Sequence, residues 1–343
     1  MTIDGIRDIY SRTQPSDNGI ELLLAAFDKE SEGGQVLTTP FKQLNKMIGG
    51  GLRKGMLSII AGPAGNGKSY WAYRLLMHLV NDGVKAVYLP LENKHEDTLK
   101  RIIASLVNSW VMTEATPEKS EQRKNIFNDR KMVDLFHKME ASIMQNPMRM
   151  LVDDNGEGYI PDTTYDDIIK LLKKRCSEID FIIIDPVTKI DAAQGSARHF
   201  QEEKFIKQLK AIAESYDCHI MSVSHTGKRQ KHKGSEVKLA VDDLSGSVAW
   251  SRFCQYVLLL DHHDEVEDDI INHIGAKLNG VSHQKTLKIA KVNEGKGKGV
   301  RIAFDFDNGA KMEELGVIID ESKTEKISDR ESNERKLPIN QRT

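Results

Sequence analysis

A glycine-rich loop follows an apolar run near the start of the chain. Residues 56–60 are mostly apolar and precede Gly-Pro-Ala-Gly-Asn-Gly-Lys-Ser at 62–69, which fills every position of the pattern G-x-x-x-x-G-K-[ST]. Such glycines let backbone N–H groups and the start of the next helix converge on one anion. The alternative is an incidental glycine-rich turn, but such a turn would have to match this pattern by chance. It would also have to lie by chance between a predicted strand and the helix predicted over 71–79. The stretch therefore predicts a strand, a phosphate-binding loop and a helix in an α/β domain.

The chemistry of this loop indicates its ligand. The lysine of the pattern reaches the β- and γ-phosphates of a nucleoside triphosphate and the following hydroxyl ligates Mg²⁺, so we expect ATP with Mg²⁺. The residues expected to bind the nucleotide are Gly62, Pro63, Ala64, Gly65, Asn66, Gly67, Lys68, Ser69 and Tyr70. Lys68 is also expected to take part in catalysis, and Ser69 to ligate the metal ion.

Composition limits the class of protein. With 343 residues, 39% of them hydrophobic and 29% charged, the chain can form a large globular domain with appendages. The formal net charge of −2 means that a nucleic-acid surface would have to be a local basic patch. Cys176, Cys218 and Cys254 lie in or beside apolar segments without metal-ligand spacing, which favours buried free thiols in a reducing compartment. Because the sequence has neither a membrane-length apolar run nor a signal-peptide core, we expect a cytoplasmic protein with no membrane partner.

Two carboxylates follow apolar segments downstream of the loop. Asp185 ends the run 181–184, which is typical of a strand buried on both faces of a parallel sheet. Its carboxylate can hold the water shell of Mg²⁺ beside Ser69. Glu92 follows the strand predicted over 84–91. From the end of an adjacent strand it can face the γ-phosphate and polarise the attacking water, although an ordinary strand-end glutamate is the alternative.

The segment that leads into the loop resembles a known family. Residues 38–55, Thr-Thr-Pro-Phe-Lys-Gln-Leu-Asn-Lys-Met-Ile-Gly-Gly-Gly-Leu-Arg-Lys-Gly, followed by the glycine-rich loop, resemble the RecA-type motor domain of the DnaB-like replicative helicases, including the short phage and plasmid forms. The resemblance covers about residues 38–319. It implies a RecA-like P-loop NTPase fold over 36–319, with a mostly parallel central sheet flanked by helices. We expect residues 1–35 to form a helical extension and linker, too short for a separate N-terminal domain, and residues 320–343 a disordered charged tail.

The same resemblance implies roles for particular residues. It makes Glu92 the catalytic glutamate and His225 a polar sensor of the γ-phosphate, with a hydrogen-bonded structural histidine as the alternative. Ring-forming members carry a lysine and, two residues on, an arginine that reaches the γ-phosphate of the neighbouring subunit. Here the lysine is Lys291, whereas Asn293 stands at the arginine position. Because asparagine has no charge, we expect Lys291 to act in trans with help from nearby cations, or else slow hydrolysis without such a residue.

The most basic segment of the chain comes directly after the strand that His225 ends. RecA-type motors present a loop at this place to their central channel, so contact with DNA phosphates is expected, although a solvated loop is the alternative. The residues expected to bind DNA are Lys228, Arg229, Lys231 and Lys233. The phrase Asp-Leu-Ser-Gly-Ser at 243–247 resembles a DNA-contacting phrase of the family but lacks its arginine, and the basic segment is expected to substitute for it.

Two hairpins are predicted toward the C-terminus. Histidines 262, 263, 273 and 283 show no regular ligand spacing, so residues 261–279 are interpreted as a surface hairpin and not as a metal site. Strands over 286–292 and 300–306 would form the second hairpin.

These features predict an ATP-dependent helicase or translocase that acts on single-stranded DNA in replication. The resemblance implies a homo-oligomer in the form of a hexameric ring, with a primase or polymerase as a partner, in the host cytoplasm if the protein is of phage origin. Two alternatives stay open: a RecA/RadA-like recombination ATPase that coats single-stranded DNA, and a regulatory or loading ATPase that binds a protein partner. Translocation polarity, nucleotide preference and ring size do not follow from the sequence.

Overall fold

The computed structural model describes residues 36–113, 118–143, 164–190, 196–226, 239–244, 247–307 and 309–319. The chain separates into two compact units, Met1–Leu37 and Thr38–Thr343. In the first unit only strand β1 (Val36–Leu37) is described. The N-terminal helical extension, the strand expected near 148–152 and the charged tail lie outside the described residues.

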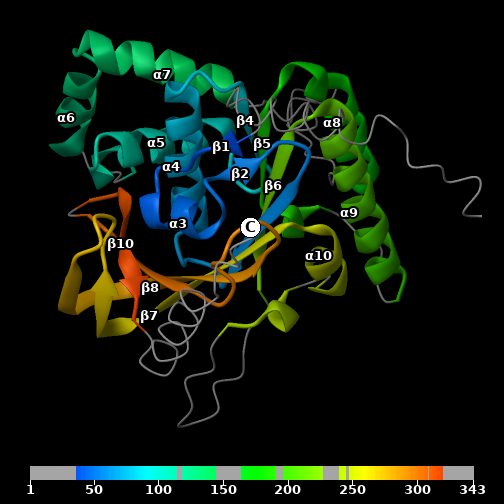
Figure 1. Cartoon of the computed structure of the whole chain (residues 1–343). Coiled ribbons are helices and arrows are strands. Elements are labelled where there is room, and N and C mark those ends of the chain that lie inside the picture. Colours follow the sequence, from blue (N-terminus) through cyan, green and yellow to red (C-terminus); the bar gives the residue numbers. More distant parts are fainter. Residues whose placement is uncertain are drawn as a thin grey trace, which may run out of the picture. The chain divides into compact units, whose positions relative to one another are not determined.

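One eight-stranded sheet forms the centre of the described part of the second unit (Figure 1). Its strand order is β10-β9-β8-β7-β3-β6-β5-β4. Strands β4, β5, β6, β3 and β7 run parallel, whereas β7, β8, β9 and β10 are antiparallel. The bounds are β3 (Leu57–Gly62), β4 (Ala86–Pro90), β5 (Phe181–Asp185), β6 (His219–His225), β7 (Tyr256–Ile271), β8 (Lys277–Val292), β9 (Arg301–Phe306) and β10 (Met312–Ile318). A short strand β2 (Leu52–Arg53) precedes β3.

Helices cover both faces of the parallel half of the sheet. Figure 1 shows α4 (Lys68–Asn81), α5 (His95–Leu106), α6 (Glu118–Ile126) and α7 (Arg130–Ser142) on one side, and α8 (Tyr165–Arg175), α9 (Ser196–Tyr216) and α10 (Ser247–Phe253) on the other. Every residue of β3 and β5 is buried, which explains their continuous apolar sequence. Leucines and isoleucines of β3, β5 and α9 share one core cluster. The short helix α3 (Lys42–Met47) lies ahead of β2 and β3.

Most expected elements of the parallel half are present. The strands predicted over 84–91, 181–184 and 219–224 correspond to β4, β5 and β6, and the helix predicted over 71–79 is the body of α4. The hairpin predicted over 261–279 is longer than expected, because β7 and β8 continue as 16-residue strands on both sides of it. Strand β10 was not anticipated, since its sequence does not alternate regularly between apolar and polar residues.

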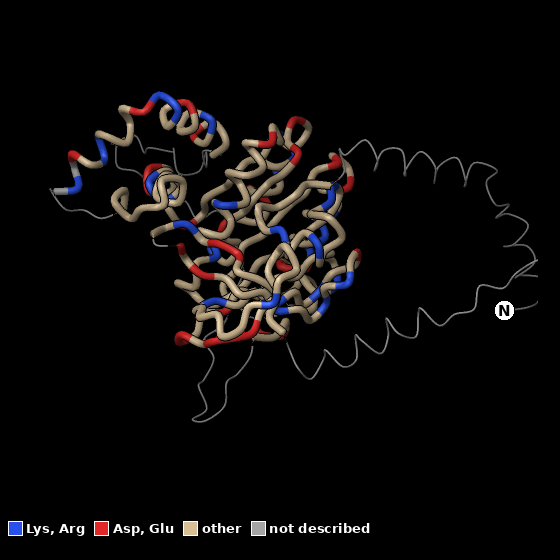
Figure 2. The backbone as a smooth tube through the Cα atoms, turned by 60° about the vertical axis from the view of Figure 1, so that its left-hand side comes forward, with Lys and Arg blue, Asp and Glu red and all other residues tan. Residues whose placement is uncertain are grey.

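Charged residues are distributed over the described chain. Figure 2 shows acidic and basic positions interspersed along the backbone, as the net charge of −2 leads one to expect. Among the described residues, no helix is both long and apolar enough to cross a bilayer.

Candidate functional site

Four neighbouring strands end at the same edge of the sheet. In the parallel register, Gly62 of β3 pairs with His225 of β6, and Pro90 of β4 pairs with Asp185 of β5. Glu92 lies two residues beyond Pro90. Because ligands of open α/β sheets bind beyond the carboxyl ends of the strands, this edge is the expected position of a site. The structure thus brings together the loop, His225, Asp185 and Glu92, as the sequence predicted.

The loop between β3 and α4 has the geometry of an anion cradle. Gly67, the residue before the first turn of α4, has φ +91°, a left-handed conformation that favours glycine. A Cβ atom at Gly67 would lie 2.5 Å from Cε of Met312 in β10, so a side chain there would require the methionine to move. Asn66 is buried and donates from Nδ2 to the carbonyl oxygen of Leu260 at 3.3 Å. The left-handed glycine at the N-cap of α4 and the anchored Asn66 side chain fix the path of the loop into the helix, whose N-terminal N–H groups can bind an anion.

Lys68 is folded back onto its own loop. Its Nζ donates to the carbonyl oxygen of Pro63 at 2.6 Å. Burial lowers the pKa of Lys68 to about 8, while the charges of Asp185 and Glu92 act in the opposite direction. An ammonium held by one carbonyl, with two carboxylates nearby, is available to bind the terminal phosphates of a nucleotide.

Asp185 is a buried carboxylate with neutral hydrogen-bond donors. The hydroxyl of Tyr88 donates to its Oδ2, and Ser69 also forms a side-chain hydrogen bond with it. Burial raises the pKa of Asp185, and these two hydrogen bonds together with Lys68 oppose that rise. The pairing of Ser69 with Asp185 fits the hydroxyl and carboxylate set that holds Mg²⁺ beside a P-loop. Sequence reasoning missed Tyr88, whose only signal was a polar hydroxyl within an apolar strand.

Glu92 reaches the same edge with its side chain 42% exposed. Its Oε1 lies 3.4 Å from Nζ of Lys189, and its Oε2 lies 3.6 Å from Nε2 of His225. Burial lowers the pKa of His225, Lys68 lowers it further, and Glu92 opposes both. His225 Nδ1 is buried and has no hydrogen-bond partner among the described residues. Glu92 is therefore flanked by Lys189, which sequence reasoning missed, and by an imidazole that favours its neutral form.

An aromatic group borders the opposite side of the loop. The ring centroid of Tyr70 lies 5.2 Å from that of Trp110 and 5.6 Å from that of Phe306, and the latter two are 5.6 Å apart. Trp110 is 37% exposed. These rings offer an apolar surface next to the first turn of α4, suited to a nucleobase. The pattern analysis included only Tyr70, because the three rings are distant in sequence.

Lys291 binds the end of a helix in its own chain. Its Nζ donates to the carbonyl oxygens of Ser251 at 2.9 Å and Cys254 at 2.6 Å, at the C-terminal end of α10. An ammonium in this position stabilises a helix C-terminus. The backbone N–H of Asn293 donates to the carbonyl oxygen of Gln255 at 3.2 Å. Contact between Lys291 and a neighbouring subunit would require its ammonium to leave both carbonyl oxygens.

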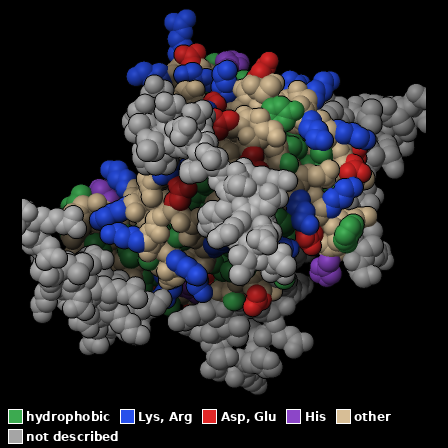
Figure 3. All heavy atoms as spheres, turned by 45° about the vertical axis from the view of Figure 1, so that its right-hand side comes forward, with side chains coloured by type: hydrophobic (Ala, Val, Ile, Leu, Met, Phe, Trp, Pro, Cys, Tyr) green, Lys and Arg blue, Asp and Glu red, His purple; other side chains and the backbone are tan. Residues whose placement is uncertain are grey.

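The residues predicted to bind DNA, 228–233, lie outside the described residues. On the face shown in Figure 3, Lys and Arg side chains are spread among acidic and neutral ones and form no single continuous patch.

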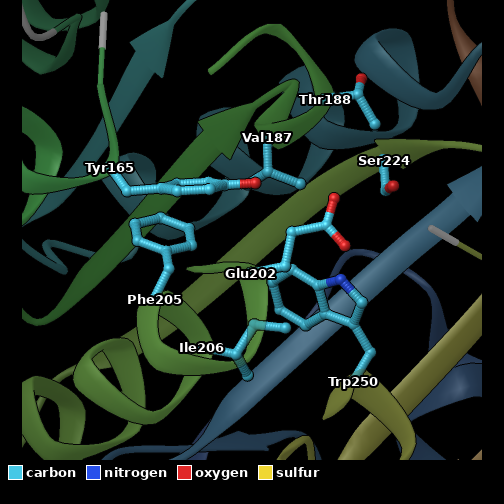
Figure 4. A pocket seen from close by; sticks show the side chains of 8 residues that line it. All are labelled: Tyr165, Val187, Thr188, Glu202, Phe205, Ile206, Ser224 and Trp250. Carbon is cyan, nitrogen blue, oxygen red and sulfur yellow. The ribbon is translucent and has the colours of Figure 1, made fainter. Parts of the chain in front are cut away.

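A small pocket is lined by residues of α8, α9, α10 and β6 and of the segment that follows β5. It is lined by Tyr165, Val187, Thr188, Glu202, Phe205, Ile206, Ser224 and Trp250 (Figure 4). In Figure 4 the carboxylate of Glu202 and the indole of Trp250 point toward one another. None of the lining residues belongs to the glycine-rich loop, so this pocket is distinct from the phosphate site expected at that loop.

Comparison with known proteins agrees with this architecture. A family model described as AAA domain matches residues 25–231. The ATPase domain of G40P superposes with a TM-score of 0.61 at 16% identity, covering 88% of this chain and 100% of that one. A DnaB-like replicative helicase, described with its interactions with primase, superposes with a TM-score of 0.62 at 16% identity, covering 88% of this chain and 67% of that one. These likenesses confirm the expected RecA-like fold.

A curated relative matches over a shorter stretch. The DNA repair and recombination protein RadB of Methanosphaera stadtmanae is 37% identical over 57 residues, which is 17% of this chain and 25% of that protein. The match therefore spans about a quarter of the length of RadB.

Proposed function

The chain belongs to the AAA domain family, and from its RecA-like ATPase fold we propose that it is an ATP-dependent helicase or translocase acting on single-stranded DNA in replication. The observation that carries this proposal is the convergence of the glycine-rich loop, Asp185, Glu92 and His225 at the ends of four adjacent strands. Those groups supply what phosphoryl transfer to water requires: an anion cradle, a metal-holding carboxylate and a carboxylate to orient the water.

Each residue of the edge has a proposed part in hydrolysis. The backbone N–H groups of residues 65–69 and the ammonium of Lys68 would hold the phosphates, with Tyr70 beside the nucleoside. Ser69 and Asp185 would hold Mg²⁺, which when bound neutralises developing charge. Glu92 would accept the proton of the attacking water, oriented by its contacts with Lys189 and His225. His225 would sense the γ-phosphate through the same contact.

The fold and the basic segment after β6 support action on DNA. The fold is that of ATPase domains from a replicative helicase and from G40P, and the basic segment 228–233 follows the β6 strand that His225 ends. A homo-hexameric ring that contacts a primase or polymerase is part of the proposal, since one of the similar structures is described with primase.

One observation favours a second candidate. The local similarity to a recombination protein supports a RecA/RadA-like ATPase that coats single-stranded DNA without unwinding it. The engagement of Lys291 with α10 and the neutral Asn293 would also suit a slowly hydrolysing loader or regulator.

One experiment separates these functions. ATPase rates would be measured with and without single-stranded DNA, alongside particle size by light scattering. Strong stimulation by DNA together with a closed ring supports the helicase or translocase. Filaments on DNA support the recombination ATPase, and hydrolysis that DNA does not affect supports the partner-binding ATPase. Absence of nucleotide hydrolysis under all these conditions would refute the proposed activity.

A further inference from the structure

Lys285 is a buried lysine beside the phosphate loop. It lies in β8, paired with His262 of β7 and with Phe304 of β9, and the residue is 4% exposed. Its Nζ lies 5.0 Å from the centroid of the Phe306 ring. A Cβ atom added to Gly67 would lie 3.6 Å from its Cε. Lys285 therefore borders the loop at the residue that begins the first turn of α4.

The ammonium of Lys285 contacts a neutral imidazole and forms no direct ion pair among the described residues. Nζ lies 3.1 Å from Nδ1 of His262, yet the same nitrogen lies 3.1 Å from the carbonyl oxygen of Gln284. One imidazole nitrogen cannot donate to a carbonyl and accept from an ammonium at once. The charge of Asp305 favours the ammonium form and opposes the lowering of the Lys285 pKa by burial, but over the described ranges no carboxylate oxygen lies within 4.0 Å of Nζ. Since a buried ammonium is costly without an anionic partner, this position is suited to binding an anion.

The phosphate loop has two chemically different sides. On one side lie Asp185 and Glu92, whose charges act on Lys68. On the other side, Gly67 approaches the side chains of Met312, Phe306 and Lys285, and β10 packs against α4 (Figure 1). Cleavage of the γ-phosphate needs the metal and the water-orienting carboxylate, so the γ-phosphate belongs on the carboxylate side. The α-phosphate and nucleoside then belong on the side of Lys285 and the aromatic rings.

We propose that Lys285 binds the α-phosphate end of the nucleotide, as a second phosphate-binding cation on the side of the loop opposite Asp185 and Glu92. This inference rests on the proposed nucleotide-hydrolysing function. A charge-assisted hydrogen bond in such buried surroundings is stronger than one in water. The α-phosphate is unchanged by cleavage at the γ-phosphate, so the contact strengthens ATP, ADP and transition-state binding alike.

The Lys285→Met variant tests this role, because methionine keeps the length and the packing on Phe306 but removes the charge. The dissociation constants of a non-hydrolysable ATP analogue and of ADP should rise by a common factor of about 10 to 100. KM should rise by a similar factor, while turnover at saturation changes far less. The control is Lys277→Met, also in β8, whose exposed side chain pairs with Asp269 at 3.1 Å and whose loss should change neither constant.

Further nucleotides distinguish phosphate contact from base contact. The loss of affinity in Lys285→Met should be the same for ADP, GDP and UDP. A loss of affinity that depends on the base would show that Lys285 contacts the nucleobase, which would overturn the proposal. An unchanged affinity for all three nucleotides would overturn it as well. Wild-type protein that binds none of them would refute the proposed function itself, which is a separate outcome.

A second measurement uses the wild-type chain in case the variant does not fold. Pyridoxal 5′-phosphate carries both a phosphate and an aldehyde that condenses with a lysine amine, and borohydride makes the product permanent for peptide mapping. Lys285 should be modified, and ADP should protect it. Modification of Lys68 alone, or modification of Lys285 that ADP does not reduce, would overturn the assignment.

Discussion

At the scale of single residues, the candidate site consists of charged side chains held in place by hydrogen bonds and ion pairs with their neighbours. Asp185 is buried against the hydroxyls of Tyr88 and Ser69, and the ammonium of Lys68 is held by a carbonyl oxygen of its own loop. Glu92 is more exposed than either and lies between Lys189 and His225. In the proposed mechanism, this arrangement would separate the residues that hold phosphate and metal from the one that acts on water.

Substitution of Lys68 and of Glu92 should separate nucleotide binding from hydrolysis. Lys68→Ala should lose both, because the phosphates lose their cation. Glu92→Gln should still bind ATP while hydrolysis falls by roughly 10²-fold or more, the usual size of a general-base contribution. Nucleotide binding by calorimetry and turnover by phosphate release would measure the two effects. Near-normal turnover of Glu92→Gln would remove Glu92 from the catalytic role.

His219 should make the stability of the protein depend on pH. Its Nδ1 donates to the carbonyl oxygen of Arg53 at 2.7 Å, its Nε2 lies 2.7 Å from the hydroxyl of Ser58, and burial lowers its pKa to about 4. The unfolded chain takes up this proton near the ordinary pKa of about 6.5, so the free energy of unfolding falls as pH drops from about 6.5 toward 4. Between pH 7 and pH 5 the loss should be about 2 kcal/mol.

Urea unfolding of the wild type and of His219→Gln at both pH values measures this effect. The variant should show a smaller difference between pH 7 and pH 5, whereas a His273→Gln control at the exposed hairpin turn should keep the wild-type difference. Equal differences in wild type and His219→Gln would contradict the linkage.

At the scale of elements, strand ends and the loops that follow them carry the residues of the candidate site. Strands β3, β6, β5 and β4 each end in a residue or loop of the site. The antiparallel strands β8, β9 and β10 provide the side chains that lie next to Gly67. Lys291 links β8 to the end of α10 and so couples the antiparallel half of the sheet to a helix of the parallel half.

The basic segment after β6 should set the affinity for single-stranded DNA. Neutralising Lys228, Arg229, Lys231 and Lys233 should weaken binding equally for different sequences, because phosphates carry no base information. The slope of log affinity against log salt should also become shallower, since fewer counterions are released. Fluorescence anisotropy at several salt concentrations measures both quantities. An unchanged slope would mean that the segment is only a solvated loop.

At the scale of the whole molecule, the proposed ring would combine the nucleotide site of one chain with a cation from the neighbouring chain. The proposed nucleotide site is formed by residues of one chain, and in phosphoryl transfer a cation from a neighbouring subunit can contribute a further factor of about 10³ or more. Lys291 is the residue expected to do so, although in the single chain its ammonium binds the end of α10.

Mixing two inactive variants tests action between subunits. Lys68→Ala and Lys291→Ala should each be inactive alone, and mixed rings should regain part of the ATPase activity, because some interfaces then combine an intact Lys68 with an intact Lys291. Light scattering and mass measurement would confirm mixed oligomers. If confirmed mixtures stay inactive, or if Lys291→Ala hydrolyses ATP normally by itself, Lys291 serves only to anchor α10.

The sequence by itself was sufficient to predict those elements that depend on particular residue types in consecutive positions. The loop at 62–69, the apolar strand ending at Asp185 and the helix that follows the loop could all be predicted, because strand burial and phosphate binding each require particular residue types in consecutive positions. The family resemblance added His225 as a candidate and supported Glu92, which its place at a strand end had already indicated, and the register of the parallel strands brought both to the same edge.

Tertiary structure alone decided the contacts between residues far apart in the chain. The N-cap residue of α3, Phe41, supplies no side-chain acceptor, and the carboxylate of Glu314 in β10 accepts the N–H groups of Gln43 and Leu44 instead. Tyr88 on Asp185 and Lys285 beside Gly67 likewise come from separate strands. Such contacts depend on which apolar faces are buried against each other, and this non-local choice leaves no signal in the spacing of neighbouring residues.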